Sequence, residues 1–225
     1  MRRRRPMLGG GGERKAERMA LTAEKLKSSL DALAAIEPAF AAAIARIGYP
    51  APRIRDSGYE TLLRAIVGQQ VSIKAAASIL ARVEAATGGT ADPTNVAATS
   101  DEDLRAAGLS RQKIAYIKSL AEEVLSGRLD FAALPADDEA AIAALTRVKG
   151  IGRWTAEVYL LFAEGRTDVW PAGDLAVQIE TGRIMGLDSK PTEKRIRELA
   201  EAWRPHRGAF AIFTWHHRRN SAAPV

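Results

Sequence analysis

The chain has 225 residues, of which 47% are hydrophobic and 27% charged, a composition typical of a globular protein and not of a disordered or fibrous one. The absence of cysteine excludes disulfides, thiolate metal sites and cysteine nucleophiles, and three histidines argue against a histidine-based metal site. The net charge is +6, but residues 1–18 hold seven basic and two acidic residues, so the rest is nearly neutral. No apolar run of about 18 residues and no secretory signal occurs, so we expect a cytoplasmic protein, nucleoid-associated in a bacterium.

The composition of residues 1–20 predicts a disordered basic arm. Four consecutive arginines at 2–5 and four glycines at 9–12 make this segment charged and flexible. It is either an arm that binds phosphates, or a solvated arm without a function, or the product of a translation start placed too early. The fold is therefore read from residue 21 onward.

Apolar residues follow helical spacing from Leu21 to Asn220, without the alternation of a strand, so we predict an all-α protein of about ten helices. The first helix carries a stripe through Leu26, Leu30 and Leu33. A second begins at Pro38, which suits a first helical turn.

Capping residues divide the middle of the chain. Ser57 precedes a helix that runs to Val67, and Ser72 opens another that stops at Gly88. We expect a loop or short turn over residues 92–100 and a short helix over 101–107. Ser110 caps a helix that ends near Leu125.

A crossover at residues 126–138 leads to helices near 139–148, 153–162, 174–185, 192–202 and 205–219. The length predicts one domain or two small lobes. We place residues 57–170 in one lobe, and residues 21–56 with 171–225 in the other.

Residues 145–156 predict two helices joined by a short glycine turn. Gly150 and Gly152 permit positive φ and a close approach of the backbone, so the N–H groups that open the second helix face solvent. Such groups bind anions, and Lys149 and Arg153 flank them. The alternative is an ordinary turn between helices.

Five segments, in order over about 160 residues, resemble the helix-hairpin-helix DNA glycosylase superfamily. Within it they resemble the DNA-3-methyladenine glycosylase II (alkylbase, AlkA-like) branch, in its compact helical form without an N-terminal β domain. The segments are Leu62–Ala77 (LLRAIVGQQVSIKAAA), Gly108–Ile117 (GLSRQKIAYI), Val148–Leu161 (VKGIGRWTAEVYLL), Asp168–Gln178 (DVWPAGDLAVQ) and Trp203–Trp215 (WRPHRGAFAIFTW).

The resemblance implies a monofunctional glycosylase that flips alkylated purines such as 3-methyladenine or 7-methylguanine out of double-stranded DNA and hydrolyses their glycosidic bond, initiating base excision repair. We expect a monomer that needs no cofactor or metal and binds no membrane. The alternatives are a glycosylase for oxidised or deaminated bases and a non-catalytic helix-hairpin-helix module that only binds DNA.

Asp174 matches the essential aspartate of these enzymes, and its place before an apolar helix also makes it an N-cap. A fixed carboxylate there would stabilise the positive sugar of the transition state. Asp168 is the competing carboxylate, interpreted as a loop cap. Trp154 stands where strand-cutting relatives have a Schiff-base lysine, and Lys149 lies on the wrong side of the turn to replace it.

By resemblance, Trp154 and Trp215 line the base pocket, where aromatic faces attract a cationic base. The chain departs from its relatives at Val158 and His206, where they often carry aromatic residues. Gln70 matches the residue that fills the flipped-out position; the alternative is that Gln69 and Gln70 are only polar residues where a helix meets a loop. The other predicted DNA contacts are Ser72, Gly150, Gly152 and Thr155. Residues 111–113 contact the DNA backbone or form a solvated face, and the remaining motif aromatics are expected in the core: Tyr159, Trp203, Phe210 and Phe213.

Overall fold

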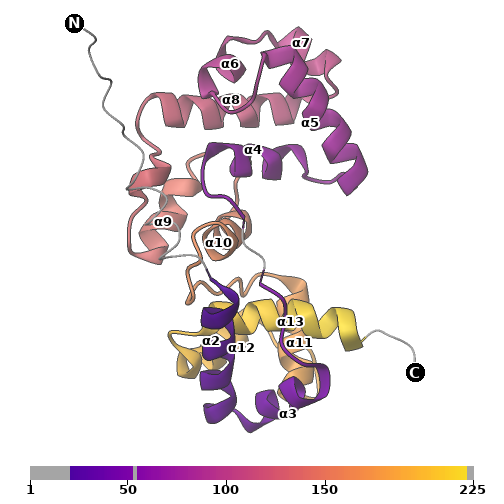
Figure 1. Cartoon of the computed structure of the whole chain (residues 1–225), viewed down its shortest axis with the longest axis vertical. Coiled ribbons are helices and arrows are strands. Elements are labelled where there is room, and N and C mark those ends of the chain that lie inside the picture. Colours follow the sequence, from indigo (N-terminus) through magenta and orange to yellow (C-terminus); the bar gives the residue numbers. More distant parts are fainter. Residues whose placement is uncertain (1–20, 53–54, 222–225) are drawn as a thin grey trace, which may run out of the picture.

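The computed structural model describes residues 21–52 and 55–221, and every regular element in this part of the chain is a helix (Figure 1). The predicted all-α class is confirmed, while the predicted arm at residues 1–20 lies outside the described residues. The α-helices are α2 (Ala23–Ile36), α3 (Pro38–Ile47), α4 (Tyr59–Val67), α5 (Ile73–Thr87), α6 (Pro93–Ala98), α7 (Asp101–Ala106), α8 (Arg111–Leu125), α9 (Asp138–Leu145), α10 (Arg153–Phe162), α11 (Leu175–Ile184), α12 (Glu193–Ala200) and α13 (Arg207–Ser221), with short 3₁₀ turns η1 (Phe131–Ala133) and η2 (Glu201–Trp203).

The buried apolar side chains separate into two cores. The first is built between residues 59 and 169, largely from α4 to α10, and forms the upper part of Figure 1. The second joins α2 and α3 to residues 161–213, so the two ends of the described chain pack together in the lower part. The lobe boundaries at residues 57 and 170 stay a prediction.

One helix contributes to both cores. Ala156, Tyr159 and Leu160 of α10 are buried in the first core. Leu161 and Phe162, the next two residues, are buried in the second. Figure 1 accordingly shows α10 between the upper and lower helices. The helix α10 is therefore held at the junction of the two lobes.

The predicted caps are confirmed where the cap bond is local. The Ser72 hydroxyl accepts the backbone N–H of Ala75 at 3.2 Å, and the Ser110 hydroxyl accepts that of Lys113 at 3.2 Å. Gly88 ends α5 in the left-handed conformation, with φ of 71°. Short-range sequence signals therefore set these helix ends.

Two local predictions are wrong. Residues 92–100 are not a loop, because α6 forms there with Asp92 as its cap, and Val96 is buried in the first core. Ser57 is not the cap of α4. That position is taken by Gly58, whose N–H donates to the hydroxyl of Tyr159 at 2.7 Å, a partner that local sequence does not reveal.

Aromatic rings fill the second core. Phe210 stacks on Phe40 with ring centroids 4.9 Å apart and on Trp203 with centroids 4.2 Å apart. Trp170 meets the edges of both Trp203 and Phe210. The prediction that Tyr159, Trp203, Phe210 and Phe213 are core residues is confirmed, since each is at most 5% exposed.

Asp168 is not a loop cap. Its two oxygens accept hydrogen bonds from Nε and Nη2 of Arg207, both at 2.8 Å, and Arg204 donates to it at 2.7 Å. Bidentate arginine–carboxylate pairs are stronger than neutral hydrogen bonds and fix geometry. This pair therefore anchors the loop that follows α10 to the start of α13.

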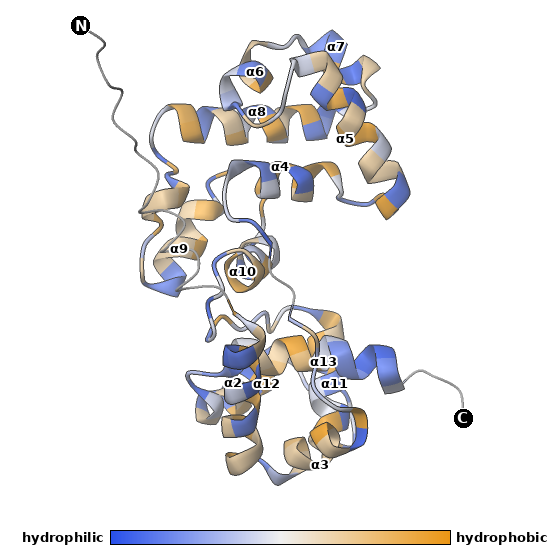
Figure 2. Cartoon of the chain, viewed as in Figure 1, coloured by the Kyte–Doolittle hydropathy of each residue, from blue (hydrophilic) through white to orange (hydrophobic). Residues whose placement is uncertain are grey.

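The end of α13 is hydrophilic and exposed. Figure 2 shows hydrophilic residues in the last turns of α13, where Arg218, Arg219 and Asn220 are exposed. Across residues 21–52 and 55–221, no helix combines the length and the apolar character needed to cross a membrane.

Gly208 permits the close approach between α13 and the loop after α10. Its N–H donates to the carbonyl of Thr167 at 2.7 Å, and a Cβ at this position would lie 2.7 Å from both that carbonyl and a methyl group of Leu161. We expect Gly208→Ala to lower the free energy of unfolding by about 1–3 kcal/mol through overpacking.

Urea unfolding followed by circular dichroism measures this change. Gly186→Ala is the matched control, because Gly186 has φ of 65° but open space around it, so its cost is backbone strain of about 1 kcal/mol. A Gly208→Ala protein as stable as the wild type would contradict the steric argument.

Candidate active site

Three predicted site residues from three helices meet at one carboxylate. Asp174 caps α11 and accepts the backbone N–H of Val177 on Oδ1 at 2.9 Å. The indole N–H of Trp154, in the first turn of α10, donates to Oδ2 at 2.8 Å. The indole N–H of Trp215, on α13, points at Oδ1 with a longer separation of 3.4 Å. The carboxylate is thus partly exposed and flanked by two indoles.

The surroundings of Asp174 fix the loop that presents it. The side-chain amide of Gln178 donates to the carbonyl of Ala172 at 2.9 Å inside the protein. The ring of Trp215 lies 5.6 Å from that of Phe162. Val158, one turn after Trp154, is partly buried against the second core. The loop that carries Asp174 is therefore tied to α11 by a buried hydrogen bond, beside packed side chains of α10 and α13.

The α9–α10 turn has the predicted hairpin form, with different roles for its two glycines. Gly150 has φ of 81°, and the ring of Tyr116 covers the place where a Cβ would project. The expectation of positive φ is not met at Gly152, whose φ is −85°. Gly152 is the N-cap of α10, and because glycine has no side chain, no side-chain hydrogen bond caps the helix. A Cβ on Gly152 would meet only open space. Thr155 lies partly exposed in the first turn of α10.

Arg153 is engaged in ion pairs instead of standing free beside the turn. Its guanidinium donates to Glu139 at 2.8 Å and to the buried Glu157 at 2.9 Å. Burial raises the pKa of Glu157, although Arg153 opposes that change. The same arginine lowers the pKa of Glu139. Lys149 is exposed, so it remains the flanking cation open to solvent on this turn.

The loop between α4 and α5 contacts the hairpin through a residue that the sequence did not single out. The amide of Gln69 donates to the carbonyl of Gly150 at 2.9 Å. Gln70 is exposed and has φ of 56°, which is uncommon for a residue with a side chain. Ser72 is exposed, and Ile73 next to it is 91% exposed. Gln70 and Ser72 are therefore exposed at the turn that leads into α5, beside the Gln69 contact with the hairpin.

The start of α8 is joined to the end of α4. The ammonium of Lys113 donates to the carbonyl of Val67 at 2.7 Å, and partial burial lowers its pKa. Arg111 and Gln112 are exposed. Of the three residues left open in the sequence, Lys113 is therefore committed to holding the α4–α5 loop.

Sequence reasoning missed Gln69, Tyr116 and Arg207. Each supports the site through a contact with a residue at least 34 positions away: Gly150 for the first two and Asp168 for Arg207. The paired glutamines at 69 and 70 were the available signal for Gln69. No local pattern indicated the other two.

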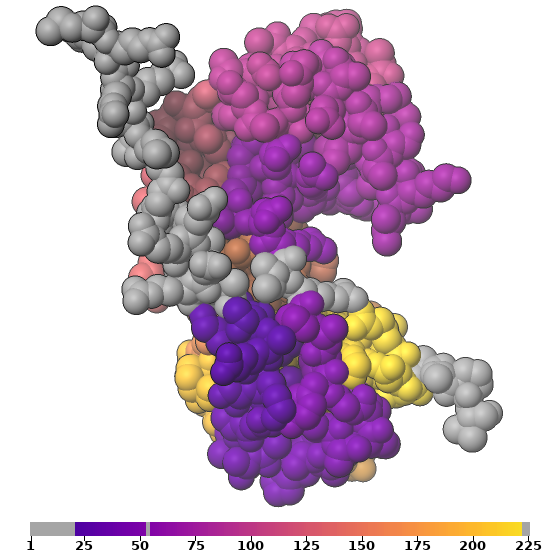
Figure 3. Space-filling view, viewed as in Figure 1, coloured from indigo at the N-terminus to yellow at the C-terminus, as the bar shows by residue number. Residues whose placement is uncertain are grey.

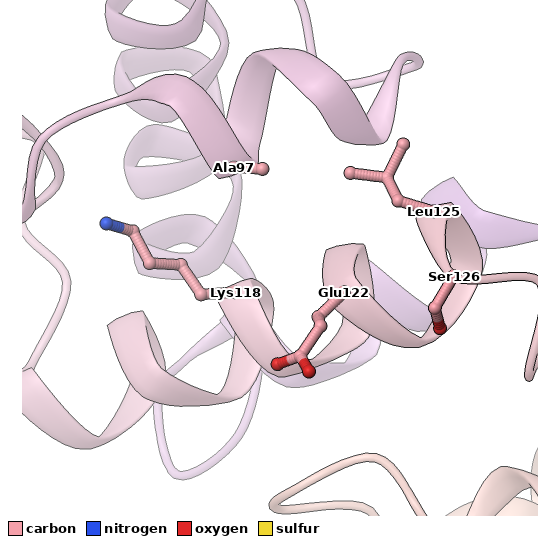
Figure 4. Close-up of a pocket in the computed structure, with 5 residues that line it drawn as sticks. All are labelled: Ala97, Lys118, Glu122, Leu125 and Ser126. Atoms are coloured by element: carbon pink, nitrogen blue, oxygen red, sulfur yellow. The ribbon is translucent and has the colours of Figure 1, made fainter.

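The surface is indented between the lobes, on the side where α5 begins and α13 ends (Figure 3). A separate hollow of about 450 Å³ lies in the upper lobe, between α6 and the end of α8 (Figure 4). Its lining contains none of the predicted site residues: Ala97, Lys118, Glu122, Leu125 and Ser126. Within the described ranges, no group of three or more His, Asp or Glu side chains could hold a metal ion.

The chain is similar in sequence and in fold to DNA repair enzymes. The chain is 36% identical over 161 residues to DNA-3-methyladenine glycosylase 1 of Schizosaccharomyces pombe, covering 70% of this chain and 71% of that protein. Its structure is similar to the DNA-3-methyladenine glycosidase of Bacillus halodurans, with a TM-score of 0.78 and 35% identity over 83% of this chain and 87% of that one.

A third similar structure contains DNA. It is the S. pombe 3-methyladenine DNA glycosylase in complex with abasic DNA, with a TM-score of 0.70 and 30% identity, over 87% of this chain and 97% of that one. The model of the HhH-GPD superfamily of base excision DNA repair proteins matches residues 63–205, which include the hairpin, Trp154 and Asp174. The chain belongs to the HhH-GPD superfamily of base excision DNA repair proteins.

Proposed function

We propose that this protein is a monofunctional DNA glycosylase that hydrolyses the glycosidic bond of alkylated purines in double-stranded DNA and so initiates base excision repair. One observation carries the proposal: the Asp174 carboxylate is held at the head of α11 between the indoles of Trp154 and Trp215. The names of the similar glycosylases support the same activity.

A carboxylate suits this reaction because breaking the glycosidic bond leaves positive charge on the deoxyribose. A fixed negative group close to the sugar stabilises that charge and orients the attacking water. The position of Asp174 as an N-cap adds to this, since the α11 N–H groups already favour negative charge there. Asp174 is therefore the proposed catalytic residue.

Two indoles beside a carboxylate suit a cationic base. Alkylation at N3 or N7 gives a purine a formal positive charge, which makes it a good leaving group and draws it to aromatic faces by about 0.5–2 kcal/mol. Acid catalysis by a histidine is then not required. Val158 offers no ring face, so stacking in this pocket depends on Trp154 and Trp215.

DNA contacts follow from the hairpin and the exposed turn that leads into α5. The first turn of α10, with Gly152 and Thr155, offers backbone N–H groups to a phosphate. Gln70 and Ser72 lie on an exposed loop that can reach the position left by a flipped base. Asp174, Trp154 and Trp215 come from one chain, which supports our proposal of a monomer. We propose that it acts in the cytoplasm, associated with the nucleoid if the cell is bacterial.

The direct test is incubation of the purified protein with methylated duplex DNA. We expect release of 3-methyladenine or 7-methylguanine, detected by chromatography, and strand scission only after alkali. Borohydride should trap no covalent adduct, because Trp154 cannot form a Schiff base. A trapped adduct would overturn monofunctional chemistry. Release confined to oxidised or deaminated bases would change the substrate class, and DNA binding without any release would indicate a binding module.

Asp174→Asn should reduce single-turnover base release at least about 100-fold, because the sugar cation loses its counter-charge. The thermal midpoint should stay close to that of the wild type, since asparagine is an equally good N-cap. Asp168→Asn is the matched control, because its carboxylate is bound to Arg204 and Arg207 and we expect it to alter stability more than the chemical step. Near wild-type release by Asp174→Asn would refute the assignment.

The two hairpin glycines should separate stability from binding. Gly150→Ala forces a Cβ into the ring of Tyr116 at positive φ, so unfolding free energy should fall by more than about 2 kcal/mol. Gly152→Ala should cost about 1 kcal/mol or less but weaken duplex binding several-fold, because a methyl group then stands before the α10 N–H groups. Fluorescence anisotropy at fixed salt measures binding. Unchanged binding by Gly152→Ala would contradict the phosphate role.

A further inference from the structure

The two oxygens of Asp174 are bound from different helices. Oδ1 accepts the Val177 N–H of its own helix at 2.9 Å, as an ordinary N-cap does. Oδ2 accepts the indole N–H of Trp154 at 2.8 Å, a donor that belongs to α10. The Trp215 indole is farther away, at 3.4 Å from Oδ1. Trp154 thus supplies the short contact that does not come from the cap itself.

This second bond restricts the carboxylate beyond what a cap requires. Capping needs only one acceptor oxygen, as the single hydroxyls of Ser72 and Ser110 show, so the bond to Oδ2 is not required by the cap. Rotation of the Asp174 carboxylate would break the Trp154 bond. Hydrogen bonds to charged groups are also stronger than neutral ones, so the orientation is held firmly.

The donor is itself anchored. Arg153, the residue before Trp154, binds Glu139 at 2.8 Å and the buried Glu157 at 2.9 Å. These pairs fix the first turn of α10, although Trp154 remains 49% exposed. An exposed indole has several rotamers open to it, and the bond to Asp174 selects one of them.

We propose that Trp154 is a positioning residue: its indole N–H holds the Asp174 carboxylate in the direction that faces the sugar, independently of any stacking of its ring on the base. This rests on the proposed glycosylase function and deepens it. The single bond sets the plane of the stacking ring and the direction of the carboxylate together, so base and sugar are placed relative to one another.

The test replaces Trp154 with 3-benzothienylalanine, in which sulfur stands for the indole N–H and the ring shape is kept. We expect single-turnover base release at saturating protein to fall about 10- to 100-fold, the range for a lost hydrogen bond to a charged group. The Kd for duplex DNA with a tetrahydrofuran abasic analogue should change less than about 3-fold. Thermal melting verifies that the substituted protein is folded.

The same replacement at Trp170 is the matched control. Because its indole N–H is buried and has no hydrogen-bond partner among the described residues, no bond is lost there, and we expect a change in rate of less than about 3-fold. Equal losses at both positions would overturn the specific role of Trp154, and so would an unchanged rate at Trp154. A loss confined to Kd would show that the ring acts by stacking alone.

A readout without catalysis separates this proposal from the proposed function. In protein with 15N-labelled tryptophan, Asp174→Asn should shift the Trp154 indole N–H resonance strongly and that of Trp203 little, because Trp203 is buried in the second core. If the wild type releases no base but this shift occurs, the proposed glycosylase function is refuted, while the hydrogen bond between Trp154 and Asp174 is supported. If the resonance does not move, the positioning proposal fails whatever the activity.

Discussion

The arrangement of the two lobes depends on how α10 divides its side chains between two cores. Tyr159 and Leu160 are buried on one side, and Leu161 and Phe162 on the other. Burial of each large apolar side chain stabilises the fold by about 1.5–3 kcal/mol, so α10 cannot leave either core without a substantial loss. The hairpin at its N-terminus and the second lobe are consequently held in one frame. The ion pairs of Asp168 with Arg204 and Arg207 fix the same junction from the opposite end of the helix.

The candidate catalytic group uses that frame. Asp174 serves as the helix cap of α11 and as the acceptor of an indole from α10, so one carboxylate joins local helix stability to the contact between lobes. A site assembled from helix ends is more rigid than one carried on loops. By contrast, Gln70 and Ser72 lie on an exposed loop whose anchor to the hairpin is the neighbouring Gln69.

How much of this could be predicted from the sequence depends on the range of the interaction. Helix ends at Ser72, Ser110 and Asp174 were predictable because the cap and its N–H partner lie three residues apart. The all-α class was predictable from apolar spacing. The six-residue helix α6 was missed, although its cap Asp92 and the proline at its first position are typical of a helix start. Ser57 was wrong as a cap because the start of α4 is set by Tyr159, 101 residues further along.

The site, too, was predictable where a local motif marked a residue and unpredictable where a distant contact decides its role. Motif resemblance singled out Trp154, Asp174 and Trp215, which the structure brings together, but spacing alone could not show which atoms meet. Asp168 was misread because its arginine partners lie 36 and 39 residues away. Contacts such as that of Gln69 with Gly150 arise only when the chain has folded, so no local pattern reports them.

The ring of Tyr116 over Gly150 has an evolutionary consequence. Position 150 cannot gain a side chain while Tyr116 stays, and its φ of 81° would strain the backbone of any other residue even beside a smaller neighbour. Among descendants of this sequence, position 150 should therefore stay glycine as long as an aromatic ring stands at 116, whereas position 152, with open space before it and φ of −85°, is free of both constraints. A constraint on the hairpin is thus recorded in a helix more than thirty residues upstream.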